Sequence, residues 1–243
     1  MKSFNWLLVL SVLSCIGCSS PVHEDGRGCA FVSDSIQYRV EFMSAGCVRI
    51  LSFPEGDTLV TKRLVVDPEK PAFKDYKWED TGKKLVFRTR ELSVAFDKED
   101  AAFTFQEVST GKLLLKEKEA KKARHFKRSV AGGEQCLEVT QRFVPTDDEA
   151  IYGLGQYQNG IMNYRGKSVL LLQANMDIVN PFLISTNGYG ILWDNYSSTK
   201  FEDTKEGYSF TSEVGDASDY YFVYGKNMDE VVAGYRELTG DVP

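Results

Sequence analysis

Neutral amide side chains gather around a glycine-rich segment in the second half of this 243-residue chain. The segment reads Tyr-Gly-Leu-Gly at residues 152–155, and Gln156, Gln158 and Asn159 follow it. Glycine permits backbone angles that are closed to other residues, and amides offer uncharged donors and acceptors that suit hydroxyl groups. Gln173 and Asn175 add two further amides. This pattern indicates contact with a hydroxyl-rich ligand such as a sugar.

Two acidic clusters could supply catalytic or metal-binding carboxylates. The first covers residues 147–149, and the second contains Glu202, Asp203 and Glu206. A calcium site needs about six to eight oxygen ligands in a defined frame, which neither cluster supplies. We expect the first cluster to be a solvated loop and the second a polar hairpin tip. We therefore assign no metal, no cofactor and no catalytic residue.

The balance of charge argues against nucleic acid as a partner. The formal net charge is −6, from 29 basic and 35 acidic residues. A nucleic-acid partner normally requires a basic surface or stripe. The dense basic run at residues 116–128 also contains Glu117 and Glu119. We expect this run to be a solvated hairpin edge, whose charges block pairing with other strands.

The first 17 residues have the layout of an export signal. Lys2 precedes an apolar run at residues 6–13, which is shorter than the roughly 20 apolar residues of a transmembrane helix. Small residues then lead to a cysteine, as in bacterial lipoproteins, whose acyl chains anchor a soluble domain to a membrane. We favour Cys18 over Cys15 as the lipidated residue, because Gly17 precedes it and polar serines follow.

This interpretation predicts a lipoprotein signal peptide over residues 1–17 and a polar tether over residues 18–29. It places the protein at the bacterial cell envelope, with a membrane contact through the lipid anchor. Ordinary cleavage, which would leave a free periplasmic protein, is the alternative.

Three cysteines follow the predicted lipidation site, namely Cys29, Cys47 and Cys136. An odd number cannot pair completely within one chain, and their spacing is not that of a zinc site. Cys47 and Cys136 lie in apolar, strand-like surroundings, so we expect buried free thiols. A disulfide between two of the three stays open, because an oxidising compartment would permit it.

Alternation of apolar and polar residues predicts strands along most of the chain. The pattern occurs at residues 36–42, 92–96, 103–105 and 137–143, and a period of two marks a strand with one buried face. Residues 182–184 and 189–193 flank Asn187 and Gly188, a strong signal for a hairpin.

A helix is predicted near the C-terminus. Asn227 can cap it, acidic residues occupy its first turn, and Val231, Val232, Tyr235 and Leu238 recur at helical spacing before Gly240. Many short strands with a single late helix predict an all-β fold, an antiparallel β-sandwich that forms one domain over residues 30–226, followed by the helix and a junction over residues 227–243.

Several motifs in a fixed order resemble the N-terminal β-domain of glycoside hydrolase family 31, particularly its bacterial α-xylosidase-like and α-glucosidase-like members. The motifs occupy residues 152–159, 163–166, 173–175, 181–185, 187–196, 218–225 and 230–240. The resemblance covers roughly residues 30–243 and implies the galactose-mutarotase-like type of β-sandwich, packed against a catalytic (β/α)8 barrel.

The resemblance also implies where the chemistry lies. In the family two barrel aspartates perform retaining hydrolysis, which needs two carboxyl groups about 5 to 5.5 Å apart. Their motifs do not occur in this sequence, since Trp193 and Asp194 belong to the sandwich hairpin. A barrel takes about 250 residues, and we expect it to be missing from this chain or to be a separate partner. The isolated chain is therefore predicted to be inactive.

The contribution expected from the sandwich is a loop over the mouth of the barrel. In family members the segment after the glycine motif reaches the substrate, which here implicates residues 163–167 and, within them, Tyr164 and Arg165. Some α-glucosidases carry an aspartate in this segment, and its absence here leaves the preferred sugar open. Gln173 and Asn175 either line the same cleft or hold the loop backbone in place.

Three hypotheses follow for the function. The first is a non-catalytic domain of an α-glycoside hydrolase that acts on an α-linked xylosyl or glucosyl saccharide. The second is a free-standing carbohydrate-binding lipoprotein. The third, a mutarotase, requires an acid and base pair, usually His with Glu. It is disfavoured because His23 and His125 are the two histidines and neither lies in a suitable motif.

Overall fold

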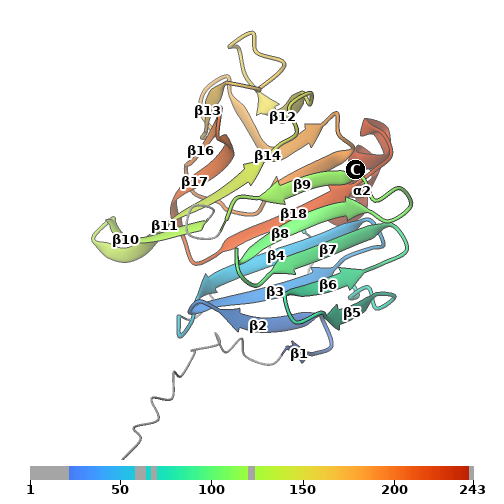
Figure 1. The fold of residues 1–243 in the computed structure, drawn as a ribbon. Helices are drawn as coiled ribbons and strands as arrows, with labels where there is room; N and C mark the ends of the chain where they lie inside the picture. Colours follow the sequence, from blue (N-terminus) through green and yellow to red (C-terminus); the bar gives the residue numbers. More distant parts are fainter. Residues whose placement is uncertain (1–21, 58–63, 67–69, 120–123, 241–243) are drawn as a thin grey trace, which may run out of the picture.

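In the part of the chain that the structure describes, the fold is a sandwich of two antiparallel sheets with one helix (Figure 1). The computed structural model describes residues 22–57, 64–66, 70–119 and 124–240. Residues 1–17 and the candidate lipidation sites Cys15 and Cys18 lie outside this part of the chain. Among the described residues, the helix is neither long nor apolar enough to cross a membrane.

One sheet has eight strands, and the two edges of this sheet carry the beginning of the described chain and the glycine-rich segment. The strand order is β1 (His23–Glu24), β2 (Cys29–Ser33), β3 (Ile36–Phe42), β4 (Cys47–Pro54), β18 (Ser218–Tyr224), β15 (Tyr189–Trp193), β14 (Ile178–Ser185) and β12 (Ile151–Gln156). β1 falls within the segment predicted as a tether, so regular pairing begins before residue 30.

The other sheet has ten strands. Its order is β13 (Ser168–Leu171), β16 (Thr199–Thr204), β17 (Gly207–Gly215), β11 (Glu134–Val144), β9 (Leu113–Glu117), β8 (Ala102–Glu107), β7 (Leu92–Asp97), β6 (Lys84–Arg88) and β5 (Lys77–Asp80), with β10 (Arg124–Ala131) paired to β11. The β10–β11 hairpin projects from the side of the sandwich in Figure 1.

The predicted strands and hairpin are confirmed. In β7 every second residue is buried, as the alternation requires. β14 and β15 pair from Ser185↔Tyr189 onward. Gly188, in the turn between them, has a φ of 89°, a left-handed value that glycine adopts without steric cost.

Aromatic side chains from both sheets fill the space between them. Phe105 of β8 stacks on Phe222 of β18 with 4.2 Å between ring centroids. Trp193 of β15 stacks on Phe210 of β17 at 5.5 Å. All four side chains are fully buried, so this aromatic layer is the main hydrophobic contact that joins the sheets.

The predicted helix is α2 (Met228–Thr239), and both of its caps are confirmed. The Asn227 side chain accepts a hydrogen bond from the backbone N–H of Glu230, and Gly240 follows the last turn. α2 packs on the outer face of the eight-stranded sheet, where the Tyr235 ring stacks on Phe182 at 4.2 Å. Val231 is buried there, whereas Val232 is partly exposed.

The expectation that the basic run is wholly a solvated edge is wrong at two residues. Glu117 and Arg124 are buried and form an ion pair inside the sandwich. Glu117 also accepts hydrogen bonds from Tyr220 at 2.8 Å and Gln141 at 3.0 Å. A buried charge requires such partners. Solvent exposure holds for Lys127 and Arg128 farther along β10.

The three described cysteines are free thiols, which confirms this expectation for Cys47 and Cys136. Cys29 and Cys47 are buried, whereas Cys136 is half-buried and the expectation of burial is wrong for it. Burial raises the pKa of Cys29 to about 11, which keeps this thiol protonated at neutral pH.

Candidate functional site

The four predicted site residues lie in two loops at one corner of the sandwich. One loop joins β12 to β13 and the other joins β13 to β14. β12 is the edge strand of one sheet and β13 is the edge strand of the other. Both loops are therefore at the end of the sandwich that is uppermost in Figure 1.

The glycines of the 152–155 motif allow β12 to approach β14 closely. A Cβ atom on Gly153 would lie 2.4 Å from the Phe182 carbonyl oxygen, and one on Gly155 would lie 2.1 Å from that of Ile178. The pairing of β12 with β14 shifts register between these two glycines. The motif is thus an irregular edge strand rather than a turn, and it is glycine-rich because a side chain would collide with the neighbouring backbone.

Asn163 fixes the start of the segment at residues 163–167. Its Oδ1 accepts hydrogen bonds from the N–H groups of Ile151, at 3.1 Å, and Arg165, at 3.0 Å. The N–H of Tyr164 donates to the Ile151 carbonyl at 2.8 Å. The segment is therefore tied to the first residue of β12.

Tyr164 is a core residue in this structure. Its side chain is 3% exposed, and its ring packs edge-to-face against Phe201 of β16, with 6.2 Å between centroids. Direct contact of Tyr164 with a ligand stays a prediction.

The Arg165 guanidinium points at two acidic residues that the sequence suggested would be solvated. Its Nε lies 3.0 Å from Asp203 Oδ2 and its Nη1 lies 3.6 Å from Glu149 Oε1. Nη1 also donates to the Thr146 carbonyl at 3.3 Å. Both carboxylates are buried, so the expected loop and hairpin-tip exposure is wrong for Glu149 and Asp203. The reason is that Arg165 neutralises charge that could not otherwise be buried.

Glu149 is held by two neighbouring strands of the eight-stranded sheet. Ser185 of β14 donates to Oε2 at 2.7 Å and Tyr189 of β15 donates to Oε1 at 3.0 Å. The Tyr189 hydroxyl lies 3.2 Å from that of Tyr208 in β17. Burial raises the pKa of Glu149 above its ordinary value of 4.5, although these two hydrogen bonds and the charge of Arg165 act in the opposite direction.

Gln173 holds the backbone of its own loop. Its Nε2 donates to the Asp177 carbonyl at 2.9 Å, and its Oε1 accepts from the Val179 N–H at 3.1 Å. This is one of the two roles that the sequence left open. Asn175 is exposed in the same loop. Sugar contact by either residue stays a prediction.

A cavity of about 320 Å³ lies beside this loop. Gln173, Val179 and Pro181 line it together with residues 194–199. Amide, hydroxyl and aromatic groups thus surround a space of small-ligand size. Tyr196 is half exposed there, and its hydroxyl accepts a hydrogen bond from the Leu64 N–H at 2.8 Å.

Exposed apolar side chains surround the same corner. Their exposed fractions run from 48% to 79%, and they belong to Met162, Leu170, Leu172, Met176 and Ile178. A group of apolar side chains in the loops and edge strands of one corner is typical of a surface that binds another protein domain.

No motif or spacing in the sequence pointed to Glu149 and Asp203 as partners of Arg165. They are 16 and 38 residues from it in the chain, and they come together only in the folded sandwich, since Glu149 precedes β12 of one sheet and Asp203 lies in β16 of the other. Among the described residues, no group of three or more His, Cys, Asp or Glu side chains could hold a metal ion.

We expect the Glu149→Gln variant to change the pH dependence of stability. Because the pKa of Glu149 is raised, the folded chain binds this proton more tightly than the unfolded chain does. The stabilisation is complete below about pH 4.5 and is lost as the pH rises through the raised pKa. The free energy of unfolding of wild type, relative to that of the variant, should therefore fall as the pH rises through this window. The total fall is about 1.4 kcal/mol for each unit by which the pKa of Glu149 in the folded chain exceeds its pKa in the unfolded chain.

Urea unfolding between pH 4 and pH 8 measures this difference. Asp148→Asn, which removes an exposed carboxyl group one residue away, is the control and should follow the wild-type slope. Parallel curves for wild type and Glu149→Gln would contradict the buried, protonatable state of Glu149.

Comparison with known protein families gives a match over most of the chain. The model described as "Glycosyl hydrolase 31 N-terminal galactose mutarotase-like domain" matches residues 37–202. The α-xylosidase of Saccharolobus solfataricus is 33% identical over 222 residues, which cover 86% of this chain and 29% of that enzyme. An uncharacterised family 31 glucosidase of Pseudescherichia vulneris is 34% identical over 49% of this chain and 22% of its own length.

Solved structures show the same fold. The family 31 α-xylosidase of Xanthomonas citri superposes with a TM-score of 0.81 and 21% identity, over 91% of this chain and 40% of that one. A family 31 α-xylosidase from a soil metagenome, complexed with xylose, gives a TM-score of 0.79 and 22% identity over 92% of this chain and 35% of that one. The chain thus spans less than half the length of these relatives.

Proposed function

This chain belongs to glycoside hydrolase family 31 and corresponds to the N-terminal galactose-mutarotase-like domain of that family, and we propose that it is the non-catalytic substrate-cleft domain of an α-xylosidase-like or α-glucosidase-like enzyme. In this proposal the corner formed by β12, β13 and β14 packs on a catalytic barrel. Residues 163–167 and 173–175 then lie at the edge of the sugar site.

The observation that carries the proposal is the coincidence of three features at this corner. The loops that hold the predicted site residues, a cavity of about 320 Å³ and five exposed apolar side chains lie together. Amides and hydroxyls suit a neutral saccharide, and the apolar side chains suit burial against a second domain. The relatives named as α-xylosidases support a xylosyl or glucosyl saccharide as the ligand.

We assign the hydrolytic chemistry to the barrel rather than to this domain. Glu149 and Asp203 are buried carboxylates beside the 163–167 segment, and each accepts an internal hydrogen bond and pairs with Arg165. A catalytic pair must instead flank a scissile bond, with one group free to protonate it. The domain therefore contributes binding and shape, and the barrel contributes the acid and the nucleophile.

We expect the isolated chain to give no turnover of p-nitrophenyl α-D-xyloside or α-D-glucoside. A chimera in which residues 30–240 replace the matching domain of the Saccharolobus solfataricus α-xylosidase should hydrolyse the xyloside, because the corner can then pack on a barrel. Release of p-nitrophenol measures both. Turnover by the isolated chain, or a folded but inactive chimera, would contradict the proposal.

Because the corner packs on the barrel in this proposal, Met176→Asp should lower the stability of the chimera more than that of the isolated chain. Met176 is 67% exposed in this domain, so the variant should change the stability of the isolated chain by less than about 0.5 kcal/mol. In the chimera the added carboxylate would be buried against the barrel, at a cost of about 2 kcal/mol or more. Thermal unfolding of both proteins measures the difference.

Val130→Asp is the matched control for Met176→Asp. Val130 is also 67% exposed, but it lies on the projecting β10–β11 hairpin (Figure 1). Its effect should be equal in the isolated chain and in the chimera. Equal effects of Met176→Asp in the two proteins would place the barrel on another face.

The proposed lipid anchor agrees with this orientation. β1 and β12 are opposite edges of the eight-stranded sheet, so with about 4.8 Å between strands they are roughly 34 Å apart. An anchor that precedes β1 would therefore leave the sugar-contact corner on the side away from the membrane. Palmitate labelling of the chain expressed in a bacterium should depend on Cys18, with Cys15→Ser as the control. Labelling that survives Cys18→Ser would refute this assignment.

A further inference from the structure

The segment at residues 163–167 is held to β16 by hydrogen bonds to both the side chain and the backbone of Asp203. Gly166 N–H donates to Asp203 Oδ2 at 2.6 Å, and Asp203 N–H donates to the Lys167 carbonyl at 2.8 Å. The Lys167 N–H donates to the Tyr164 carbonyl at 3.1 Å. Asp203 therefore binds the turn through its side chain and through its backbone.

Arg165 supplies the positive charge beside two buried carboxylates at the turn. The side chains of Glu149 and Asp203 are at most 1% exposed. Among the described residues, Arg165 is the one cation that pairs with either of them. Removal of the guanidinium would leave buried carboxylates without a counter-charge, which is far more costly than the loss of a surface ion pair.

We propose that Arg165 is a positioning residue, whose guanidinium clamps the 163–167 turn between Glu149 and Asp203 and does not itself contact the sugar. The guanidinium spans the two carboxylates and the Thr146 carbonyl, so its Nε and Nη1 donors are directed into the protein. Ordering of the turn before a ligand arrives lowers the entropy lost on binding. Tyr164 is buried, and Lys167 is therefore the exposed long side chain that the turn presents.

The clamp is tested in the isolated chain by hydrogen exchange of the amides of residues 164–167, without any sugar. In Arg165→Gln these amides should exchange roughly 100-fold faster than in wild type, relative to amides in β7, because an unpaired buried charge favours local opening. Arg165→Lys keeps the charge and loses the planar fork, so it should give an intermediate rate.

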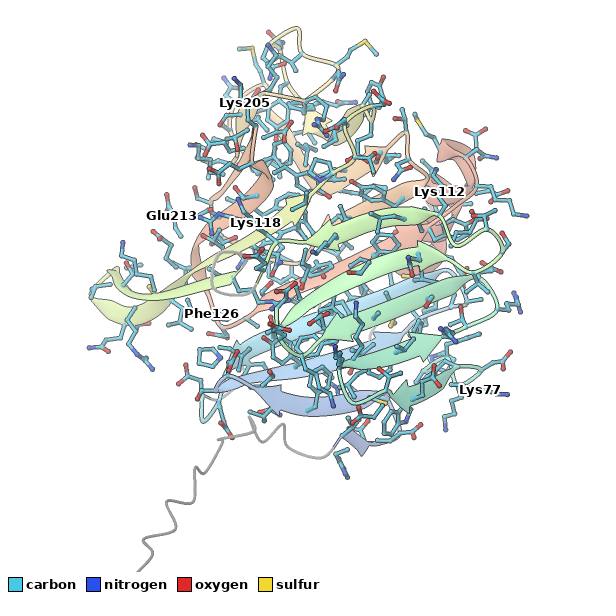
Figure 2. All side chains as sticks on the ribbon, in the orientation of Figure 1. Lys77, Lys112, Lys118, Phe126, Lys205 and Glu213 are labelled. Atoms are coloured by element: carbon cyan, nitrogen blue, oxygen red, sulfur yellow. The ribbon has the colours of Figure 1, made fainter. Side chains whose placement is uncertain are left out.

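Lys205→Gln is the control. Lys205 lies at the exposed tip of the β16–β17 hairpin, close in sequence to Asp203 (Figure 2). The variant makes the same change of charge and should exchange within about 3-fold of wild type, as expected for a surface substitution. If Arg165→Gln does not fold, the comparison of Arg165→Lys with Lys205→Gln still tests the clamp. Unchanged exchange in the Arg165 variants would overturn it.

The role of the clamp in sugar binding rests on the proposed function and has its own readout. In the active chimera, Arg165→Lys should raise KM for the xyloside several-fold more than it lowers kcat, and Lys205→Gln should change neither. Faster exchange with no change in KM would keep the clamp and refute its role in binding. Normal exchange with a raised KM would instead show that Arg165 contacts the sugar, which overturns the proposal.

Discussion

The structure depends on the requirement that two sheets close over one aromatic core without leaving an uncompensated charge inside. Stacked pairs such as Phe105 with Phe222 join the sheets and exclude water from the space between them. A carboxylate that enters this space must therefore bring partners with it. Glu117 does so with Arg124, and Glu149 does so with Ser185, Tyr189 and Arg165.

The same requirement gives the candidate site its form. Two sheet edges, β12 and β13, end at one corner, and the chain must pass between them. The connection at residues 163–167 is held where Asp203 accepts the Gly166 N–H and pairs with Arg165. The remaining loop surface carries amides and apolar side chains, which a sugar and a second domain can use. The site is thus built from loops, although its rigidity comes from charges buried at the sheet edges.

The sequence was informative where a local pattern determines structure. The alternation in β7, the Asn187–Gly188 hairpin and both caps of α2 were predictable, because each depends on residues that are neighbours in the chain. The motif order also gave the family and the type of sandwich. The partners of Arg165 were not predictable, because Glu149 and Asp203 meet it only through the pairing of distant strands. The same limit applied to Arg124, whose burial depends on Glu117, Tyr38 and Ala101 coming together.

A crystal structure of the chimera with xylose bound tests most directly whether this domain completes the sugar site. We predict that an atom of residues 163–167 or 173–175 lies within about 3.5 Å of a sugar hydroxyl, directly or through one water. We also expect Met176 and Ile178 to be buried against the barrel. A bound xylose with no atom of this domain nearby, and a corner that remains open to solvent, would contradict the claim that this domain completes the sugar site.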